Sequence, residues 1–196
     1  TTDTLVEDNS IYIGNDPSST TNTAQYNVAV GVTALDAVTT GDDNIAVGYN
    51  ALSANTTGTR NVAVGIDALL SNTTGSYNSA LGPSVLTANI SGDDNTASGY
   101  GALYSNTIGS SNVALGTNAL NVNTTGAGNT SSGSRALLRN TTGSFNTASG
   151  YGAGDVITTG SNNTIIGYDA DPSTNNAINQ IVIGKGATGL GNNYAV

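Results

Sequence analysis

Two pairs of adjacent carboxylates are the side chains of this sequence best suited to acid–base or metal chemistry. Asp42-Asp43 and Asp93-Asp94 each follow a glycine in a turn-like segment, and 51 positions separate the two pairs. Glycoside hydrolysis uses two carboxylates that flank one bond, and Ca²⁺ takes carboxylate oxygens as ligands. The simpler alternative is that all four are solvated turn residues. We predict no bound metal, with Asp42, Asp43, Asp93 and Asp94 as weak Ca²⁺ candidates.

Most other catalytic side chains are missing from the chain. It has no His and no Cys, and Lys185 is its only lysine. A thiol nucleophile, a Ser–His pair and a disulfide framework are therefore excluded. We predict that the chain is not an enzyme, has no catalytic residues and binds no cofactor.

The charge of the chain limits its partners. Thirteen acidic and four basic residues give a formal net charge of −9. Binding to nucleic acid requires clusters of Lys and Arg, and a membrane-spanning helix requires about 20 apolar residues in a row. The sequence offers neither, so we expect no nucleic acid partner and no membrane insertion.

The carboxylate pairs occupy the same slot of a unit that repeats every 17 residues. The repeat is anchored by a glycine that runs from Gly14 to Gly184 without insertion or deletion. A short, fixed period predicts stacked copies of one supersecondary unit. The central members of this column are Gly31, Gly48, Gly65, Gly82, Gly99, Gly116, Gly133, Gly150 and Gly167.

Each repeat contains a short strand signal. If the asparagine at Asn27 is position 1, positions 1–5 read as a strand in 27–31, 44–48, 61–65 and 112–116. The following Thr-Thr-Gly is typical of a turn, and a second short strand is plausible near positions 8–13. Two glycines and several Thr or Asn per repeat oppose a helix. We therefore predict an all-β, parallel β-solenoid with 17-residue turns.

The domain organisation follows from the register. We predict a lead-in or junction over residues 1–9 and a β-solenoid of eleven repeats over residues 10–196. The last repeat is expected to end in register at Val196, without a distinctive polar cap. The chain begins at Thr1 rather than Met, so we expect a processed product or a piece of a longer protein.

The stacking distance tests whether the carboxylate pairs form one site. Coils about 4.8 Å apart make a rod roughly 50 Å long and place the two pairs roughly 14 Å apart. Glycoside hydrolysis needs carboxylates about 5–9.5 Å apart. One chain therefore does not unite them, although a site between two chains stays open.

Position 1 forms a column of amides along the rod. Nine of the eleven repeats carry Asn there, and Ser10 and Gln180 are the exceptions. Stacked amides pair from coil to coil in parallel strands, so we expect a structural ladder rather than a ligand site. Its members are Asn27, Asn44, Asn61, Asn78, Asn95, Asn112, Asn129, Asn146 and Asn163.

The strand segment predicts self-association. Val28 and Val30 point to one side and Ala29 to the other, and neither side carries charge, as in strands covered on both faces. A thin coil covers only one face, so we expect a second copy of the chain to cover the other. The small residue at position 3, such as Ala63, is expected to face the neighbouring chain. A threefold arrangement suits a rod, although a twofold one is also open.

Asn61–Tyr77, NVAVGIDALLSNTTGSY, resembles repeats of phage tail-fibre-like proteins and large bacterial surface proteins. Val28-Ala29-Val30-Gly31 also resembles the head repeats of trimeric autotransporter adhesins, which are trimeric left-handed parallel β-rolls but usually have a shorter turn. The resemblance implies a homotrimeric fibre segment in a virion, acting as a stiff spacer or receptor-facing shaft. A bacterial surface adhesin or extracellular filament is the alternative. Implied partners are other fibre or virion proteins and a host surface glycan or receptor.

The repeated aromatic and threonine residues suggest a third possible function, that of an ice- or glycan-binding solenoid. Exposed aromatic rings can stack on sugars or meet a partner, although they can also simply cover coil edges. Flat arrays of Thr can order water, but Thr56-Thr57 points only one hydroxyl outward, because neighbouring strand residues face opposite ways. The possible contact tyrosines, all at position 6, are Tyr49, Tyr100, Tyr151 and Tyr168.

Overall fold

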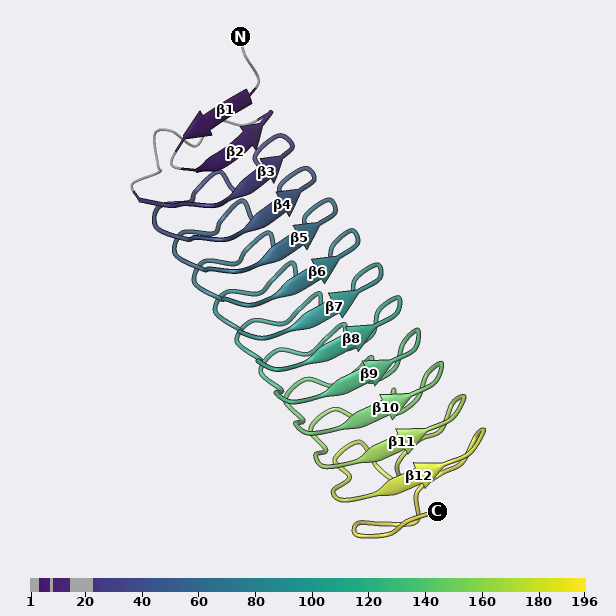
Figure 1. Cartoon of the computed structure of the whole chain (residues 1–196). Helices are drawn as coiled ribbons and strands as arrows, with labels where there is room; N and C mark the ends of the chain where they lie inside the picture. The colour runs from purple at the N-terminus through teal and green to yellow at the C-terminus, as the bar shows by residue number, and fades with distance from the viewer. Residues whose placement is uncertain (1–3, 8, 15–22) are drawn as a thin grey trace.

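The computed structural model describes residues 4–7, 9–14 and 23–196 and forms one twelve-stranded sheet (Figure 1). Part of the predicted lead-in over residues 1–9 lies outside the described residues. The strands follow one another in the sheet in sequence order. They are β1 (Thr4–Glu7), β2 (Ser10–Ile13), β3 (Val28–Val30), β4 (Ile45–Val47), β5 (Val62–Val64), β6 (Ser79–Leu81), β7 (Thr96–Ser98), β8 (Val113–Leu115), β9 (Thr130–Ser132), β10 (Thr147–Ser149), β11 (Thr164–Ile166) and β12 (Ile181–Ile183).

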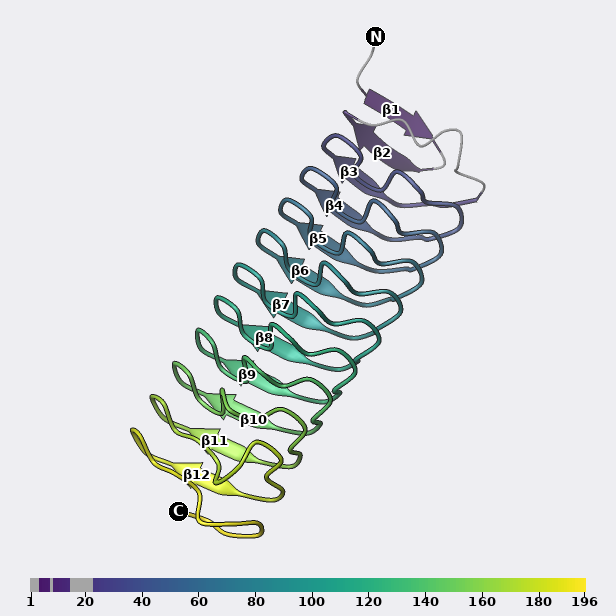
Figure 2. The ribbon, with the colours of Figure 1, turned by 180° about the vertical axis from the view of Figure 1, so that it is seen from behind.

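Strands β2 to β12 are parallel and stack as a β-solenoid, which confirms the predicted fold class. Each strand residue pairs with the residue 17 positions later, as Ile45 does with Val62 and Ala46 with Ala63. The coils form an elongated rod, and the sheet makes up one side of it (Figures 1 and 2). The described residues contain no helix.

The predicted second strand near positions 8–13 is wrong. That segment consists of turns, and the residues at positions 7 and 9 have positive φ, for example Asp67 at 56° and Leu69 at 52°. Two left-handed residues so close together prevent an extended chain. The coils are still joined there, because the N–H of Leu52 donates to the Ala68 carbonyl at 3.0 Å.

The interior is filled by three apolar columns. Alanine at positions 3 and 8 and leucine at position 9 are fully buried within the single chain, as Ala63, Ala68 and Leu69 illustrate. The expectation that position 3 faces a neighbouring chain is therefore wrong. The narrow interior of a 17-residue coil accepts only a small side chain opposite leucine. The larger residues at positions 2 and 4 consequently point outward.

The glycine of position 5 is required by both conformation and space. Gly48 has φ = 138°, and a Cβ built there would lie 2.5 Å from the carbonyl oxygen of Gly65 in the next coil. No L-residue with a side chain fits that geometry without moving the backbone. The column therefore sets how closely the coils stack.

Both ends of the parallel sheet are covered. At one end β1 pairs antiparallel with β2. At the other, the N–H groups of Ile181 and Ile183 donate to the carbonyls of Tyr194 (3.0 Å) and Val196 (2.8 Å). Ile181 pairs with Ala195, only 14 positions away. The final coil thus closes three residues early and covers the edge of β12, contrary to the expectation of a full, uncapped last repeat.

Candidate functional site

The first carboxylate of each pair links two coils. Asp42 Oδ1 accepts a hydrogen bond from the Gln25 N–H, and Asp93 Oδ1 accepts one from the Ser76 N–H, both at 2.7 Å. Serine does the same at this repeat position, since the Thr59 N–H donates to Ser76 Oγ at 3.1 Å. The aspartates therefore act as backbone-bridging side chains that serine replaces in other coils.

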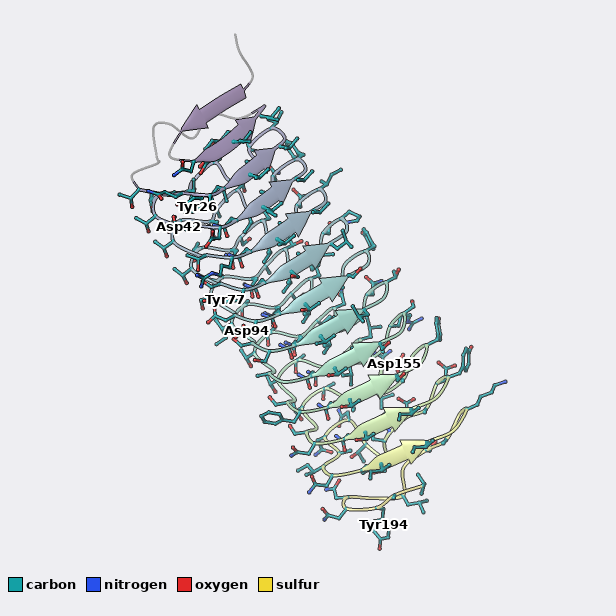
Figure 3. All side chains as sticks on the ribbon, in the orientation of Figure 1. Tyr26, Asp42, Tyr77, Asp94, Asp155 and Tyr194 are labelled. Atoms are coloured by element: carbon teal, nitrogen blue, oxygen red, sulfur yellow. The ribbon has the colours of Figure 1, made fainter. Side chains whose placement is uncertain are left out.

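The second carboxylate lies outside the coil. Asp43 pairs with Arg60 Nε at 3.5 Å, and the Arg60 guanidinium lies 5.3 Å from the centre of the Tyr77 ring and donates to its hydroxyl. Figure 3 places Asp42 and Asp94 along one edge of the rod, well separated from each other. The described residues contain no cluster of three or more His, Cys, Asp or Glu suited to a metal ion. The structure thus leaves the four candidate carboxylates apart.

The position-1 asparagines form the expected ladder inside the rod. Asn44 Oδ1 accepts from both the backbone N–H (3.0 Å) and the side-chain Nδ2 (3.1 Å) of Asn61. The same pattern repeats down to Asn163, and each of these asparagines is buried. The column therefore satisfies the amides within the protein and leaves nothing for a ligand.

A second amide ladder, at position 12, escaped sequence reasoning. Asn72 Nδ2 donates to Asn55 Oδ1 at 2.9 Å and to the Gly75 carbonyl at 2.9 Å. That carbonyl also accepts Asn61 Nδ2, so the two ladders meet at the glycine of position 15. The available signal was the Asn of the recurring Asn-Thr-Thr-Gly. The fully buried members are Asn55, Asn72, Asn89, Asn106, Asn123 and Asn140.

The threonine columns have two different roles. The hydroxyl of Thr56 donates to the Thr73 carbonyl at 3.0 Å, and Thr124 donates in the same way to Thr141. The next residue of each pair, such as Thr57, is exposed. Only one hydroxyl per coil therefore faces outward, and the inner one is already used between coils.

Two of the four position-6 tyrosines are stacked on each other. The Tyr151 and Tyr168 rings lie 5.4 Å apart at 15°. Arg135 lies over the Tyr151 ring and Lys185 over the Tyr168 ring, at 6.0 and 5.8 Å. The neighbouring Asp169 carboxylate, with some burial, raises the pKa of Tyr168. These two tyrosines are therefore engaged with each other and with one cation each, while 42% of Tyr151 and 52% of Tyr168 stays exposed.

One carboxylate near the end of the rod is poorly placed. Asp171 occupies position 9, where most coils have leucine, and burial together with Asp155 raises its pKa. Its buried Oδ1 has no hydrogen-bond partner in the part of the chain that the structure describes. The residue is half-buried, so its ionised form loses part of its hydration while Oδ1 gains no partner, and this costs stability.

The outward face of the sheet carries two columns of exposed apolar side chains. Position 2 includes Ile45 and Val62, and position 4 includes Leu81 and Ile183, all well exposed in the single chain. In several middle coils these positions hold hydroxyls, as in Thr96 and Ser98 of β7. The face is thus an apolar stripe with a semi-polar middle section.

Comparisons of the chain with protein-family models, curated proteins and solved structures gave no match. The part of the chain that the structure describes contains no helix that could span a membrane.

Proposed function

We propose that the chain is a structural fibre segment, a stiff spacer or receptor-facing shaft of a phage tail fibre or related virion appendage. In this proposal three copies associate side by side along their length. The stacked coils support a mechanical role, because backbone bonds between coils recur in one register, with the position-1 ladder from Asn27 to Asn163 and the position-12 ladder from Asn55 to Asn140 beside them. Bending the rod would strain every ladder at once.

The observation that carries the proposal is the outward sheet face. Its apolar side chains run along part of the rod axis, as Ile45 and Val62 do in β4 and β5, and hydroxyls interrupt them in β7, β9 and β10. Contiguous exposed apolar surface on a soluble protein marks an interaction site. A second copy offers the same face in the same period, which is the condition for a symmetric assembly.

The alternative roles differ in how the rod is anchored or used. A bacterial surface adhesin or extracellular filament shares the architecture, and flanking sequence would distinguish them: a virion-attachment domain favours the phage fibre and a membrane anchor the adhesin. Ice binding has less support, because the Thr56 and Thr124 hydroxyls are already bonded between coils. A test for thermal hysteresis separates that role from the others.

The assembly face is tested with neighbouring residues of β5. Val62 points outward and Ala63 inward, at 36% and 0% exposure. We expect Val62→Glu to keep the fold, measured by circular dichroism, and to shift native mass spectra from trimer to monomer. Ala63→Glu should unfold its coil, because it buries an unpaired charge.

A matched control lies outside the strands. Thr142→Glu adds the same charge at an exposed position away from the sheet face, so the trimer should persist. A wild-type chain that is monomeric at all concentrations tested would overturn the assembly proposal. A trimer that survives Val62→Glu would place the interface on another face.

A further inference from the structure

A hollow of about 200 Å³ opens in the loops that follow β6, β7 and β8. Repeat position 7 carries no side chain in the middle coil of this group. Ser84 and Asn118 occupy this position in the coils on either side, but the middle coil has Gly101. All three have positive φ, at 55°, 55° and 65°, so the backbone path is unchanged. The hollow is lined by Ser84, Tyr100, Gly101, Tyr104, Asn118 and Asn121.

Two tyrosines flank the hollow and keep their ring faces accessible. Tyr100 and Tyr104 are 57% and 45% exposed. Among the described residues, no aromatic ring or cation stacks on either of them, in contrast to Tyr151 and Tyr168. The face of a tyrosine ring carries negative partial charge and attracts the positive edges of C–H groups. The hollow therefore offers two surfaces for a ligand with apolar C–H faces.

The remaining lining groups are neutral hydrogen-bonding side chains. Asn121 Nδ2 donates to the Gly101 carbonyl at 2.7 Å and lies 3.4 Å from Asn118 Oδ1. These contacts hold both amides at the rim. Asn121 Oδ1, Asn118 Nδ2 and Ser84 Oγ have no hydrogen-bond partner among the residues described, so acceptors and donors are both available to a ligand.

We propose that this hollow binds one neutral pyranose ring of a glycan. A sugar ring combines C–H faces, which suit the tyrosines, with hydroxyls that donate and accept, which suit the amides. A volume of about 200 Å³ equals that of roughly seven waters, the scale of one monosaccharide. No charged residue lines the hollow and the net charge is −9, which disfavours acidic sugars. The site goes beyond the proposed shaft role and needs no self-association.

The proposal is tested by saturation-transfer NMR on the full chain. The probes are glucose, galactose, mannose and N-acetylglucosamine, with N-acetylneuraminic acid and a short proline-rich peptide as competing ligand classes. We expect at least one neutral sugar to bind with a Kd of about 1 mM, since a small open site gives only weak affinity. The acidic sugar and the peptide should give no transfer.

Variants tie binding to the hollow. Gly101→Asn adds the side chain that Asn50 and Asn118 carry at the same position with similar φ, so the backbone path should be kept. Its Cβ would lie 2.6 Å from Asn118 Oδ1 and 3.2 Å from Asn121 Nδ2, so it displaces both rim amides as it fills the hollow. We expect at least a tenfold loss of sugar affinity from Gly101→Asn and from Tyr100→Ala. Tyr49→Ala is the matched control, because Tyr49 has the same repeat position and similar exposure but lies in another coil.

Three results would overturn the proposal. No transfer from any of the four neutral sugars, an unchanged affinity in Gly101→Asn, or a preference for the peptide or acidic sugar would each reject it. Native mass spectra of the same samples report the assembly state separately. A monomer that binds sugar rejects the shaft proposal alone, and a trimer that binds none rejects the glycan site alone.

Discussion

Buried amides explain at the residue scale how so polar a sequence folds into a rod with a dry interior. A buried amide is costly unless its donors and acceptors are satisfied. In both ladders every inner asparagine receives a hydrogen bond from one neighbouring coil and gives one to the other, as Asn89 does between Asn72 and Asn106. The polar columns therefore hold the coils in register rather than opposing their burial.

Removing one amide from the middle of a ladder should destabilise the rod. In Asn106→Ala, Asn89 Oδ1 loses its donor at a fully buried site. We expect the free energy of unfolding to fall by about 1–3 kcal/mol, the cost of one unsatisfied buried group. Urea unfolding followed by circular dichroism measures the change. The exposed Asn176→Ala should stay within about 0.5 kcal/mol of wild type, and an equal effect of both variants would contradict the ladder's role.

Asp171 should make stability depend on pH. Its pKa is raised above the usual 3.8 mainly by burial, so the folded state favours the protonated carboxyl. The stability that the protonated carboxyl contributes is therefore fully present below pH 3.8 and is lost as pH rises through the folded-state pKa. We expect Asp171→Asn to remove that decline and to be the more stable protein at pH 7, measured by urea unfolding across this range.

A surface carboxylate serves as the control for the change in net charge. Asp94→Asn removes the same charge from an exposed position. Asp94→Asn should still show the decline in the free energy of unfolding as pH rises. A decline that persists unchanged in Asp171→Asn would show that another group causes it.

At the scale of elements, the sequence predicted the strands and their period but not the path of the loops. Val28–Val30 and its copies alternate around a buried alanine, and the glycine of position 5 ends each strand. The return segment was harder, because leucine rarely adopts positive φ and nothing in Leu52 or Leu69 signals it. The prediction that Ala63 faces a neighbouring chain was wrong for a related reason. The core lies on the side of the strand where the position-9 leucines pack, and the sequence does not show where those leucines lie.

The hollow beside Gly101 could not be predicted from the sequence either, because it also depends on the path of the loops. Tyr100 was recognised as a possible contact, and Tyr104, Asn118 and Asn121 were not. These residues come together only because positions 6, 7 and 10 of adjacent loops meet on one wall. The arrangement depends on turn geometry, which the repeat pattern alone does not specify.

The coil of β10 and the strand after it show how neighbouring elements compensate one another. Position 9 is Gly154 instead of leucine, and a Cβ there would lie 3.1 Å from Leu137 Cδ2, 3.4 Å from Ile157 Cδ1 and 3.6 Å from Ile165 Cγ1. Ile157 replaces the usual asparagine and Ile165 the usual alanine, and both are fully buried. Two larger side chains thus fill the space that the glycine leaves.

Restoring the leucine alone should therefore overpack this coil. We expect Gly154→Leu to lower the free energy of unfolding by about 1–3 kcal/mol. Combining it with Ile157→Asn and Ile165→Ala restores the repeat pattern and gives Asn140 Oδ1, which lacks a partner among the described residues, a donor. The triple variant should recover most of the loss in thermal unfolding. Additive destabilisation by the three changes would contradict this compensation.

At the scale of the whole molecule, each coil contacts mainly the coils before and after it. The parallel pairs run from β2–β3 to β11–β12 without a crossover. Stability in such a rod is close to a sum of coil terms and interface terms. Whole repeats can therefore be added to or removed from the rod, but the 17-residue register between neighbouring coils must be kept.

Deleting one complete repeat should leave the architecture intact. Removing residues 61–77 joins Arg60 to Asn78 and preserves both ladders. We expect native-like circular dichroism and a urea m-value lower by about a tenth, because less surface is exposed on unfolding. Removing only residues 61–68 should abolish cooperative unfolding. Equal behaviour of the two deletions would contradict a rod held by register.

Each of the two amide ladders also has an electrical direction of its own. In both columns one N–H of the side-chain amide points toward the coil that precedes it, as from Asn61 to Asn44 and from Asn72 to Asn55, and the amide also donates to a main-chain carbonyl such as that of Gly75. The aligned amides within one row polarise one another in the same sense. The row that ends at Asn140 leaves an oxygen facing onward. The amino-terminal end is therefore the positive pole of each row and the carboxy-terminal end the negative one.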